Sequence, residues 1–399
     1  MRKTKFLVKL SVMSLLLGLG IGGASLEMQA QTCNAEWTGN AGNGSWNSAG
    51  NWSPRKVPGA TSNVCIPTFA QAEGAGLDGS ASSITVHSIQ IGEGGALLLG
   101  SGKVSISTSV TNQGFITLYG TTLSAGSIAL PSGGEIDVYD SSSIACPAFS
   151  NAAGTVSVGT GGTLRLTDNP VQLESGNLSG GNWLVGGALM VPSNISQITS
   201  QGTVVDIDGI GSAVEDASGG NALAGLTSVG PGAVLALFDS ASLTVAQNLT
   251  NQGVVDASGS LTVNGTYTQG TGASTNMGGT LSATSVTVQA GSTLGGNGTV
   301  ESSITNDGTV SPQGSLTVTG NYTQASGAAL SEQFSSTLHV GGSATLSGAL
   351  NITINPKHPP LSGAMYTALT SGSLNGSFTM HTTGYTVTTS GNSIEVTKQ

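Results

Sequence analysis

The side chains best placed for acid–base or metal chemistry are carboxylates on short predicted strands. Asp206 and Asp208 are separated by one residue, so on an extended strand they point to the same face. Two carboxylates on one face can hold Ca²⁺ or act as acid and base on a glycan. Other close pairs are Asp137 with Asp140 and Glu215 with Asp216. A polysaccharide lyase also needs a nearby cation, and Arg165 is the only Lys or Arg between residues 104 and 356. We therefore favour a solvated strand face over an active site.

Motifs for metals, nucleotides and nucleophiles are incomplete. Asp206-Ile207-Asp208-Gly209 begins like a calcium loop, but the later ligands and the closing Glu are missing. His87, His339, His358 and His381 are too dispersed to predict a metal site. Nucleophile-elbow and phosphate-loop patterns do not occur in a strand-to-helix setting. We expect no catalytic residue, no cofactor and no metal, and therefore a protein that is not an enzyme.

Three of the four tryptophans, Trp37, Trp46 and Trp52, fall within residues 31–70. Aromatic rings can stack on sugars, so these residues, with Asp206 and Asp208, are the candidate glycan contacts. Three indoles in one short segment are more often its hydrophobic core, and we favour that interpretation.

Cys33 and Cys65 bracket the tryptophan-rich segment, and outside the cytoplasm such a pair would close a loop. We therefore predict a Cys33–Cys65 disulfide. The alternative is a lipid-modified Cys33, but the preceding Ala30-Gln31-Thr32 is a poor match to the small apolar sequence that this processing prefers. Cys146 is left over and is predicted to be a small buried hydrophobic residue.

Residues 1–30 have the pattern of a secretory signal peptide. Arg2, Lys3, Lys5 and Lys9 precede a glycine-broken apolar stretch, and cleavage is plausible after Ala30. A membrane anchor is the alternative, but a spanning helix needs about 20 apolar residues. The remaining chain carries six Lys or Arg against nineteen Asp or Glu, a net charge of −13. This charge disfavours nucleic acid and anionic membrane surfaces as partners, and we expect no membrane insertion once the signal is removed.

The chain contains an internal repeat, which indicates stacked structural units. TNQGVVDASGSLTVNGTYTQ at 250–269 returns as TNDGTVSPQGSLTVTGNYTQ at 305–324, 55 positions later. Short apolar-polar-apolar triplets recur between residues 80 and 325, and their outer residues should point inward from strands of three to five residues. These triplets begin at Val104, Val156, Leu164, Leu235, Leu243, Leu261, Val286 and Leu316.

The triplets at Leu243 and Leu261 are 18 residues apart, which suits one coil of three short strands and three turns. Four related turns begin with the pairs Thr111-Asn112, Asn151-Ala152, Thr250-Asn251 and Thr305-Asn306 and end in Gly. Asn tolerates the left-handed conformation and Gly supplies positive φ, so these turns predict tight corners. Asn stacked on Asn could also bond from coil to coil.

These patterns predict an all-β chain folded as a right-handed parallel β-helix, a solenoid, with an up-and-down antiparallel β fold as the rival. Both ends of a solenoid need covering, because open strand edges promote aggregation. We expect a signal peptide at 1–30, a Trp- and Cys-containing N-terminal cap at 31–75, the β-helix repeat at 76–325 and a C-terminal antiparallel β cap at 326–399.

Several motifs resemble the start and body of autotransporter passenger-like surface proteins of bacteria. They are Trp37-Thr38-Gly39, Gly42, Gly44, Trp46, Asn51-Trp52, Val57-Pro58-Gly59 and the run from Leu316 to Gln324. The resemblance implies a secreted or cell-surface protein of the bacterial envelope, often adhesive, that meets an extracellular glycan or a host or matrix protein. The family's C-terminal translocator barrel has no counterpart here, so we do not expect the chain to export itself. We expect a non-enzymatic surface, matrix or adhesin-like element, and the alternative is a β-helix that binds or cleaves extracellular polysaccharide.

Overall fold

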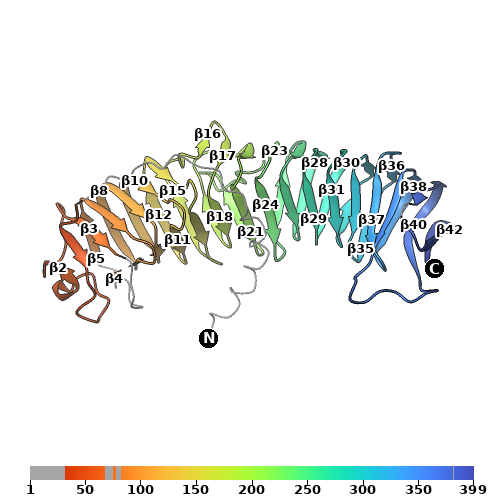
Figure 1. Cartoon of the computed structure of the whole chain (residues 1–399). Coiled ribbons are helices and arrows are strands. Elements are labelled where there is room, and N and C mark those ends of the chain that lie inside the picture. Colours follow the sequence, from red (N-terminus) through yellow and green to blue (C-terminus); the bar gives the residue numbers. More distant parts are fainter. Residues whose placement is uncertain (1–31, 68–74, 78–81, 381) are drawn as a thin grey trace. The chain divides into compact units, whose positions relative to one another are not determined.

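The computed structural model describes residues 32–67, 75–77, 82–380 and 382–399. Strands in this part stack in parallel coils and form a β-solenoid of about 14 turns (Figure 1). The predicted all-β parallel β-helix is therefore confirmed, and the antiparallel rival is wrong. The signal peptide predicted at 1–30 lies outside the described residues.

The described strands form three sheets, and the short 3-10 helix η3 spans Ala49–Asn51. Sheet A contains β1 (Ala35–Trp37), β2 (Trp52–Ser53), β3 (Asn63–Ile66), β5 (Ser82–Val86), β6 (Ser88–Ile91), β8 (Gly102–Asn112), β10 (Thr121–Ala129), β12 (Ser141–Ala145), β13 (Ala148–Ser150), β15 (Thr163–Leu166), β19 (Ala188–Met190) and β22 (Ala213–Glu215). Sheet B contains β4 (Ala75–Leu77), β7 (Ala96–Leu99), β9 (Phe115–Leu118), β11 (Glu135–Val138), β14 (Thr155–Val158), β18 (Asn182–Val185), β21 (Val204–Asp208), β24 (Val234–Phe238), β27 (Val254–Ala257), β29 (Ser274–Met277), β31 (Thr293–Gly296), β34 (Thr309–Pro312), β37 (Ala329–Gln333), β39 (Ala349–Thr353) and β41 (Thr379–Met380). Sheet C contains β16 (Leu173–Glu174), β17 (Asn177–Ser179), β20 (Gln197–Thr199), β23 (Ser228–Val229), β25 (Ser242–Val245), β26 (Leu249–Asn251), β28 (Ser260–Gln269), β30 (Thr280–Val288), β32 (Thr299–Glu301), β33 (Ile304–Asn306), β35 (Ser315–Val318), β36 (Tyr322–Gln324), β38 (Thr337–Leu346), β40 (Met365–Gly376), β42 (Tyr385–Ser390) and β43 (Ser393–Lys398).

The interior of the solenoid is built from the predicted triplets. All eight place their outer residues in the core, each with an exposed fraction of 4% or less. Leu243 pairs with Leu261 in register, so 18 residues make one coil. Asn251, Gln269, Val288 and Asn306 also pair in sequence, which means that the 55-residue repeat spans three coils. Burial of these aliphatic stacks is the main favourable contribution to folding.

The Asn-containing corners work differently from the prediction. Asn112, Asn251 and Asn306 are buried, and each side-chain oxygen accepts a hydrogen bond from the glycine N–H two residues later, at 2.9–3.1 Å. None of those glycines has a positive φ, so that part of the prediction is wrong. Glycine is needed at Gly308, for example, because a Cβ there would lie 2.7 Å from the Ser292 carbonyl oxygen and closer still to that of Gln289. The reason for glycine is therefore the close approach of the preceding coil.

A ladder of buried amides runs along this corner. The amide groups of Asn251 and Asn306 donate to the carbonyl oxygens of Ser274 and Ala329 in the following coil, at 2.9 and 3.0 Å. Gln324 occupies the same position one coil after Asn306 and donates to Ala349 at 3.0 Å. The predicted coil-to-coil bonding occurs, but most of it joins amide to backbone and not Asn to Asn. These bonds supply hydrogen-bond donors to backbone carbonyl groups at the turns that would otherwise be buried without a partner.

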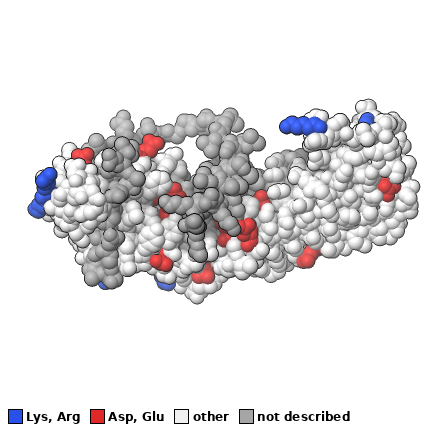
Figure 2. Space-filling view, turned by 90° about the horizontal axis from the view of Figure 1, so that it is seen from below, with Lys and Arg blue, Asp and Glu red and all other residues white. Residues whose placement is uncertain are grey.

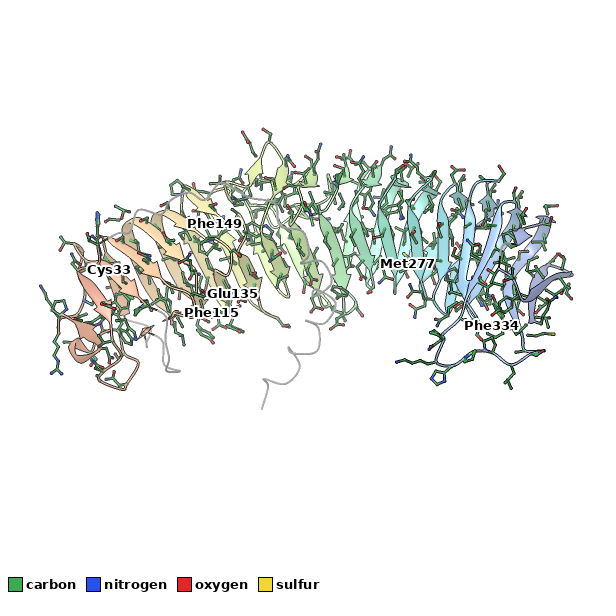
Figure 3. The ribbon with its side chains drawn as sticks, in the orientation of Figure 1. Cys33, Phe115, Glu135, Phe149, Met277 and Phe334 are labelled. Carbon is green, nitrogen blue, oxygen red and sulfur yellow. A yellow bond between two sulfur atoms is a disulfide. The ribbon has the colours of Figure 1, made fainter. Side chains whose placement is uncertain are left out.

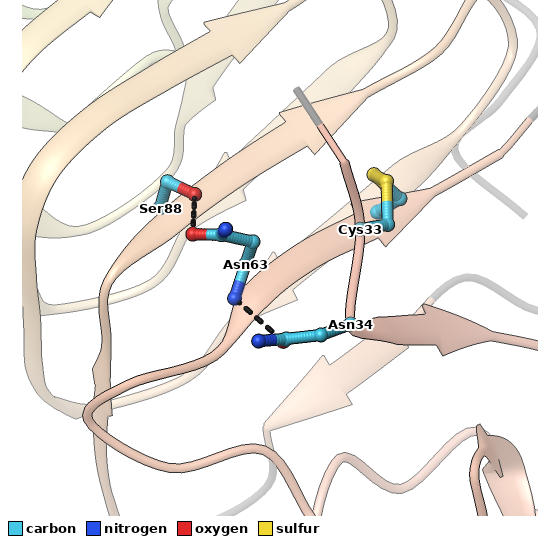
Figure 4. The surroundings of a disulfide bond; sticks show 5 residues. Cys33, Asn34, Asn63 and Ser88 are labelled. Carbon is cyan, nitrogen blue, oxygen red and sulfur yellow. Dashed lines mark hydrogen bonds between the residues drawn. A yellow bond between two sulfur atoms is a disulfide. The ribbon is translucent and has the colours of Figure 1, made fainter. Parts of the chain in front are cut away.

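The first coil is closed by the tryptophan-rich segment. β2 pairs antiparallel with β1, and β1 pairs parallel with β3, so parallel stacking begins before residue 76. The predicted Cys33–Cys65 disulfide is present and joins the start of the described chain to β3 (Figure 4). Beside it, Asn63 receives a hydrogen bond from Ser88 at 2.9 Å and donates its backbone N–H to Asn34 at 2.8 Å.

Removing the disulfide should loosen this end of the solenoid. Because 32 positions separate the two cysteines, the paired change Cys33→Ser with Cys65→Ser should cost about 3–4 kcal/mol through the freer unfolded chain. Urea unfolding of both forms measures the loss, and mass spectrometry of the wild type should show two hydrogens fewer than the reduced chain. A lipid-modified Cys33 or unchanged stability would contradict the prediction.

The other end of the solenoid is closed by antiparallel strands. β40 pairs parallel with β38, and β43 then pairs antiparallel with both β40 and β42. Parallel coils therefore continue well beyond residue 325, and antiparallel pairing within 326–399 is confined to Met365–Lys398. Beneath these strands, Glu332 of β37 faces the core and is 1% exposed. Its Oε2 accepts a hydrogen bond from the Tyr366 hydroxyl at 3.3 Å, and burial raises its pKa well above the ordinary value.

No helix among residues 32–67, 75–77, 82–380 and 382–399 is both long and apolar enough to cross a lipid bilayer.

Candidate functional site

The three cap tryptophans are buried in the first coil. Trp37, Trp46 and Trp52 have exposed fractions of 2% or less. The Trp52 ring lies 4.9 Å from that of Trp37 and 4.7 Å from that of Trp46, in edge-to-face contacts, and its Nε1 donates to the Trp46 carbonyl at 2.7 Å. The indole rings therefore pack edge to face inside the cap and do not form an open platform.

Asp206 and Asp208 lie on the outer side of sheet B. The burial pattern of β21 alternates, so both carboxylates project from the same face, as predicted. Asp206 pairs in register with Leu184 and Ala236 on the neighbouring coils, and Asp208 with Phe238. This part of the surface combines two acids with apolar neighbours.

The other carboxylate pairs have different surroundings. Asp216 accepts hydrogen bonds from Ser218 N at 2.8 Å, Ser218 Oγ at 2.6 Å and Gly220 N at 3.0 Å. These bonds lower the pKa of Asp216 and close the loop after β22, which is a structural role. Asp137 lies on β11 with its nearest acidic partner at Glu135, not at the predicted Asp140.

The described histidines His87 and His339 have separate hydroxyl partners. His87 contacts Ser107 at 3.0 Å and His339 contacts Thr370 at 2.9 Å, while His381 lies outside the described residues. Within the described part of the chain, no group of three or more His, Cys, Asp or Glu could hold a metal ion. Cys146 is buried in the core, as predicted, and burial raises the pKa of its thiol.

The solenoid interior also contains a small apolar cavity near the middle of the described chain. Its volume is about 10 Å³, close to the minimum for one water molecule, and an apolar cavity of this kind stays dry. It is lined by Pro170, Leu173, Leu178, Trp183, Leu189, Val191, Ile195, Val205 and Val214. The cavity is therefore a packing defect and not a ligand site.

A patch on sheet B gathers exposed aromatic and acidic side chains that the sequence analysis did not connect. It comes from β7, β9 and β11 and the turns that follow them, and we name it the aromatic–acidic patch: Leu98, Phe115, Tyr119, Glu135, Asp137 and Tyr139. Its four apolar members are 40–50% exposed, and among the described residues they are four of nine large hydrophobic side chains at the surface. Isolated exposed hydrophobic residues are ordinary, but gathering on adjacent coils is a feature of interaction surfaces.

The coil register brings the members of the patch together. Phe115 pairs with Glu135 across neighbouring coils, and both project from the same side of the sheet (Figure 3). Thr117 pairs with Asp137 in the next outward row. Tyr119 and Tyr139 follow these strands, and their rings stack with centroids 5.2 Å apart and an interplanar angle of 15°. The Tyr139 ring also lies next to Gly159 of the following coil, and this glycine has no side chain that could cover the ring.

The two acids of the patch are electrostatically coupled. Partial burial, the charge of Glu135 and a hydrogen bond between the two carboxyl groups raise the pKa of Asp137 to about 7. Burial and the same acids raise the pKa of Tyr139. A cation beside Asp137 would oppose these effects, because it favours the ionised form of the carboxyl group.

Positive charge is scarce throughout the described surface, as Figure 2 shows for one face. The strands that carry the patch, β7, β9 and β11, contain no Lys or Arg, and neither does the adjacent β14. The patch therefore has negative potential and no basic side chain of its own strands to neutralise it.

Searches against models of protein families and against curated proteins found no match.

Proposed function

We propose that this protein is an exported, non-enzymatic β-helical element of the bacterial surface or extracellular matrix, with an adhesin-like role. The resemblance to autotransporter passenger-like proteins supports this proposal, as do the β-solenoid fold and the disulfide between Cys33 and Cys65. Structural disulfides form in oxidising compartments and are rare in the cytoplasm of most organisms.

The single observation that carries the proposal is a long, regular, uncharged outer face. Six threonines stand in register on six successive coils of sheet C: Thr250, Thr268, Thr287, Thr305, Thr323 and Thr345. Neighbouring coils lie about 4.8 Å apart, so these side chains form a flat row of hydroxyl and methyl groups. Such a face is suited to extended contact and lacks the concave, water-excluding shape of a small-molecule site.

Localisation of a tagged full-length copy tests this proposal. The mature chain should be found outside the cytoplasm with the disulfide formed, and it should stay on cells or matrix after mild washing. A matched control, Leu16→Arg, breaks the apolar stretch of the predicted signal and should keep the chain inside the cell. Cytoplasmic wild-type protein with reduced cysteines would contradict the proposal. Free secretion without retention would favour a soluble role.

A second candidate, polysaccharide binding or cleavage, is favoured by the shared outward face of Asp206 and Asp208. Activity on acidic and neutral glycans, lost in Asp206→Ala and kept in Asp140→Ala, would support it and would contradict the non-enzymatic proposal. Absence of depolymerisation and of glycan binding by the wild type would reject this candidate.

A further inference from the structure

The aromatic–acidic patch departs from the rest of the solenoid surface. Outward positions elsewhere are largely Ser, Thr and Asn, whereas here Tyr119 and Tyr139 expose 40% and 50% of their surface and Phe115 exposes 41%. Exposed aromatic area of this size contributes strongly to binding when a partner covers it. The tyrosine rings support each other by stacking, so they present a preorganised surface.

The acids beside these rings indicate the charge of the partner. Glu135 and Asp137 come from the same strand, point outward and hydrogen-bond to each other. A cation placed between them would favour the ionised form of Asp137 and relieve the repulsion between the two carboxylates. Since the patch strands and β14 contain no Lys or Arg, the cation must come from another molecule or from another part of the chain.

Of the cationic groups in proteins, the guanidinium group of arginine suits both the aromatic and the acidic side chains of the patch. It is planar, stacks on aromatic faces, bonds to carboxylates through two parallel N–H groups and loses its hydration more readily than an ammonium group. Phe115 lies beside Glu135, and Leu98 lies in the row of Asp137 one coil beyond Thr117, so both offer apolar surface for the carbon stem of the same side chain.

We propose that the aromatic–acidic patch binds a basic segment of a partner protein, with an arginine guanidinium against Tyr139 and bonded to the carboxylates of Glu135 and Asp137. This inference names a partner class for the adhesive role proposed above. It rests on that role because the partner would be met outside the cell. Binding to the purified protein is tested separately, so failure here leaves the localisation test unaffected.

The test uses the purified protein and a fluorescein-labelled pentapeptide of alternating glycine and arginine. Asp137→Asn and Tyr139→Ala should each weaken binding at least about tenfold, the loss of one hot-spot contact. Tyr139→Phe keeps the ring and should bind within about twofold of the wild type. The matched control is Asp256→Asn, which removes the same charge from the same outward row of sheet B five coils away. Circular dichroism of each variant verifies folding.

Proton linkage supplies an independent measurement. Because the cation favours the ionised form of Asp137, binding should tighten as pH rises from 6 to 8, through the pKa of Asp137 at about 7. Calorimetry in two buffers of different ionisation enthalpy should detect release of up to about one proton per peptide.

Three results would overturn the inference. One is no binding at peptide concentrations up to about 1 mM. Another is an equal loss of binding in Asp256→Asn, which would indicate attraction to the acidic protein in general. The third is binding of a neutral glycan, and not of the peptide, that disappears in Tyr139→Ala, which would assign the patch to sugars.

Discussion

Replacing Gly308 with alanine is expected to destabilise the solenoid by at least about 3 kcal/mol, toward the upper end for single substitutions. The added Cβ would lie 2.7 Å from the Ser292 carbonyl oxygen, and the preceding coil cannot retreat without breaking its own strand pairing. The change should also disturb the bond from Gly308 N–H to the buried Asn306 amide. Urea unfolding followed by circular dichroism measures the effect.

Gly327 provides the matched control for this experiment. It lies about one coil later, its φ is not positive, and a Cβ there would have no atom within 4 Å. Gly327→Ala should therefore change stability by no more than about 0.5 kcal/mol, or raise it slightly by restricting the unfolded chain. Equal effects at the two glycines would show that close approach between coils is not what selects glycine.

Replacing Glu332 with glutamine should raise stability at alkaline pH and remove most of the pH dependence of the C-terminal coils. Burial raises the pKa of Glu332 in the folded state, so the folded chain holds its proton where the unfolded chain has lost it. The neutral carboxyl therefore contributes its full stability below the unfolded value of about 4.5, and this contribution is lost as pH rises toward the folded value. The wild type should lose about 1.4 kcal/mol per pH unit over that interval.

The measurement compares urea unfolding of the wild type and Glu332→Gln at pH 5, 7 and 9. The same region contains three tyrosines whose pKa values burial raises above 10: Tyr322, Tyr366 and Tyr385. The pH of the measurements stays below 10, so that these hydroxyl groups remain protonated in both states. Asp137 adds a slope of the same sign in both proteins, between its ordinary pKa of 3.8 and its folded value of about 7. Glu301→Gln, which changes an exposed residue of β32, is the control. A wild type as stable at pH 9 as at pH 5 would contradict the prediction.

The coil geometry could be predicted because identical residues return at matched positions. The 18-residue spacing of Leu243 and Leu261 corresponds to one coil, and alternation correctly assigned the inward residues. The function of the corner glycines could not be predicted, since close approach to a preceding coil depends on three-dimensional stacking that local turn preferences do not contain. The extent of the parallel coils was also underestimated, because residues after 325 lose the repeated letters but keep the alternation.

The candidate site was harder to predict than the fold. Tyr119 and Tyr139 are 20 positions apart, and their stacking depends on the coil length in a region where the triplets are less regular. One signal is present in the sequence: Glu135 and Asp137 are two residues apart and must share a strand face, whereas Asp140 lies beyond the end of the strand. Glu332 had a comparable signal, because alternation places it on the same inward side as Leu330.

The whole-coil length of the internal repeat has a consequence for the gene. The two matching 20-residue segments begin 55 residues apart, which is three complete coils, so recombination between them would insert or excise a block whose boundary strands meet equivalent partners. The product would keep its corner amides aligned and both closed ends intact. The number of coils in the solenoid could therefore change by three at a time through such recombination, with no change to the sequence of either closed end.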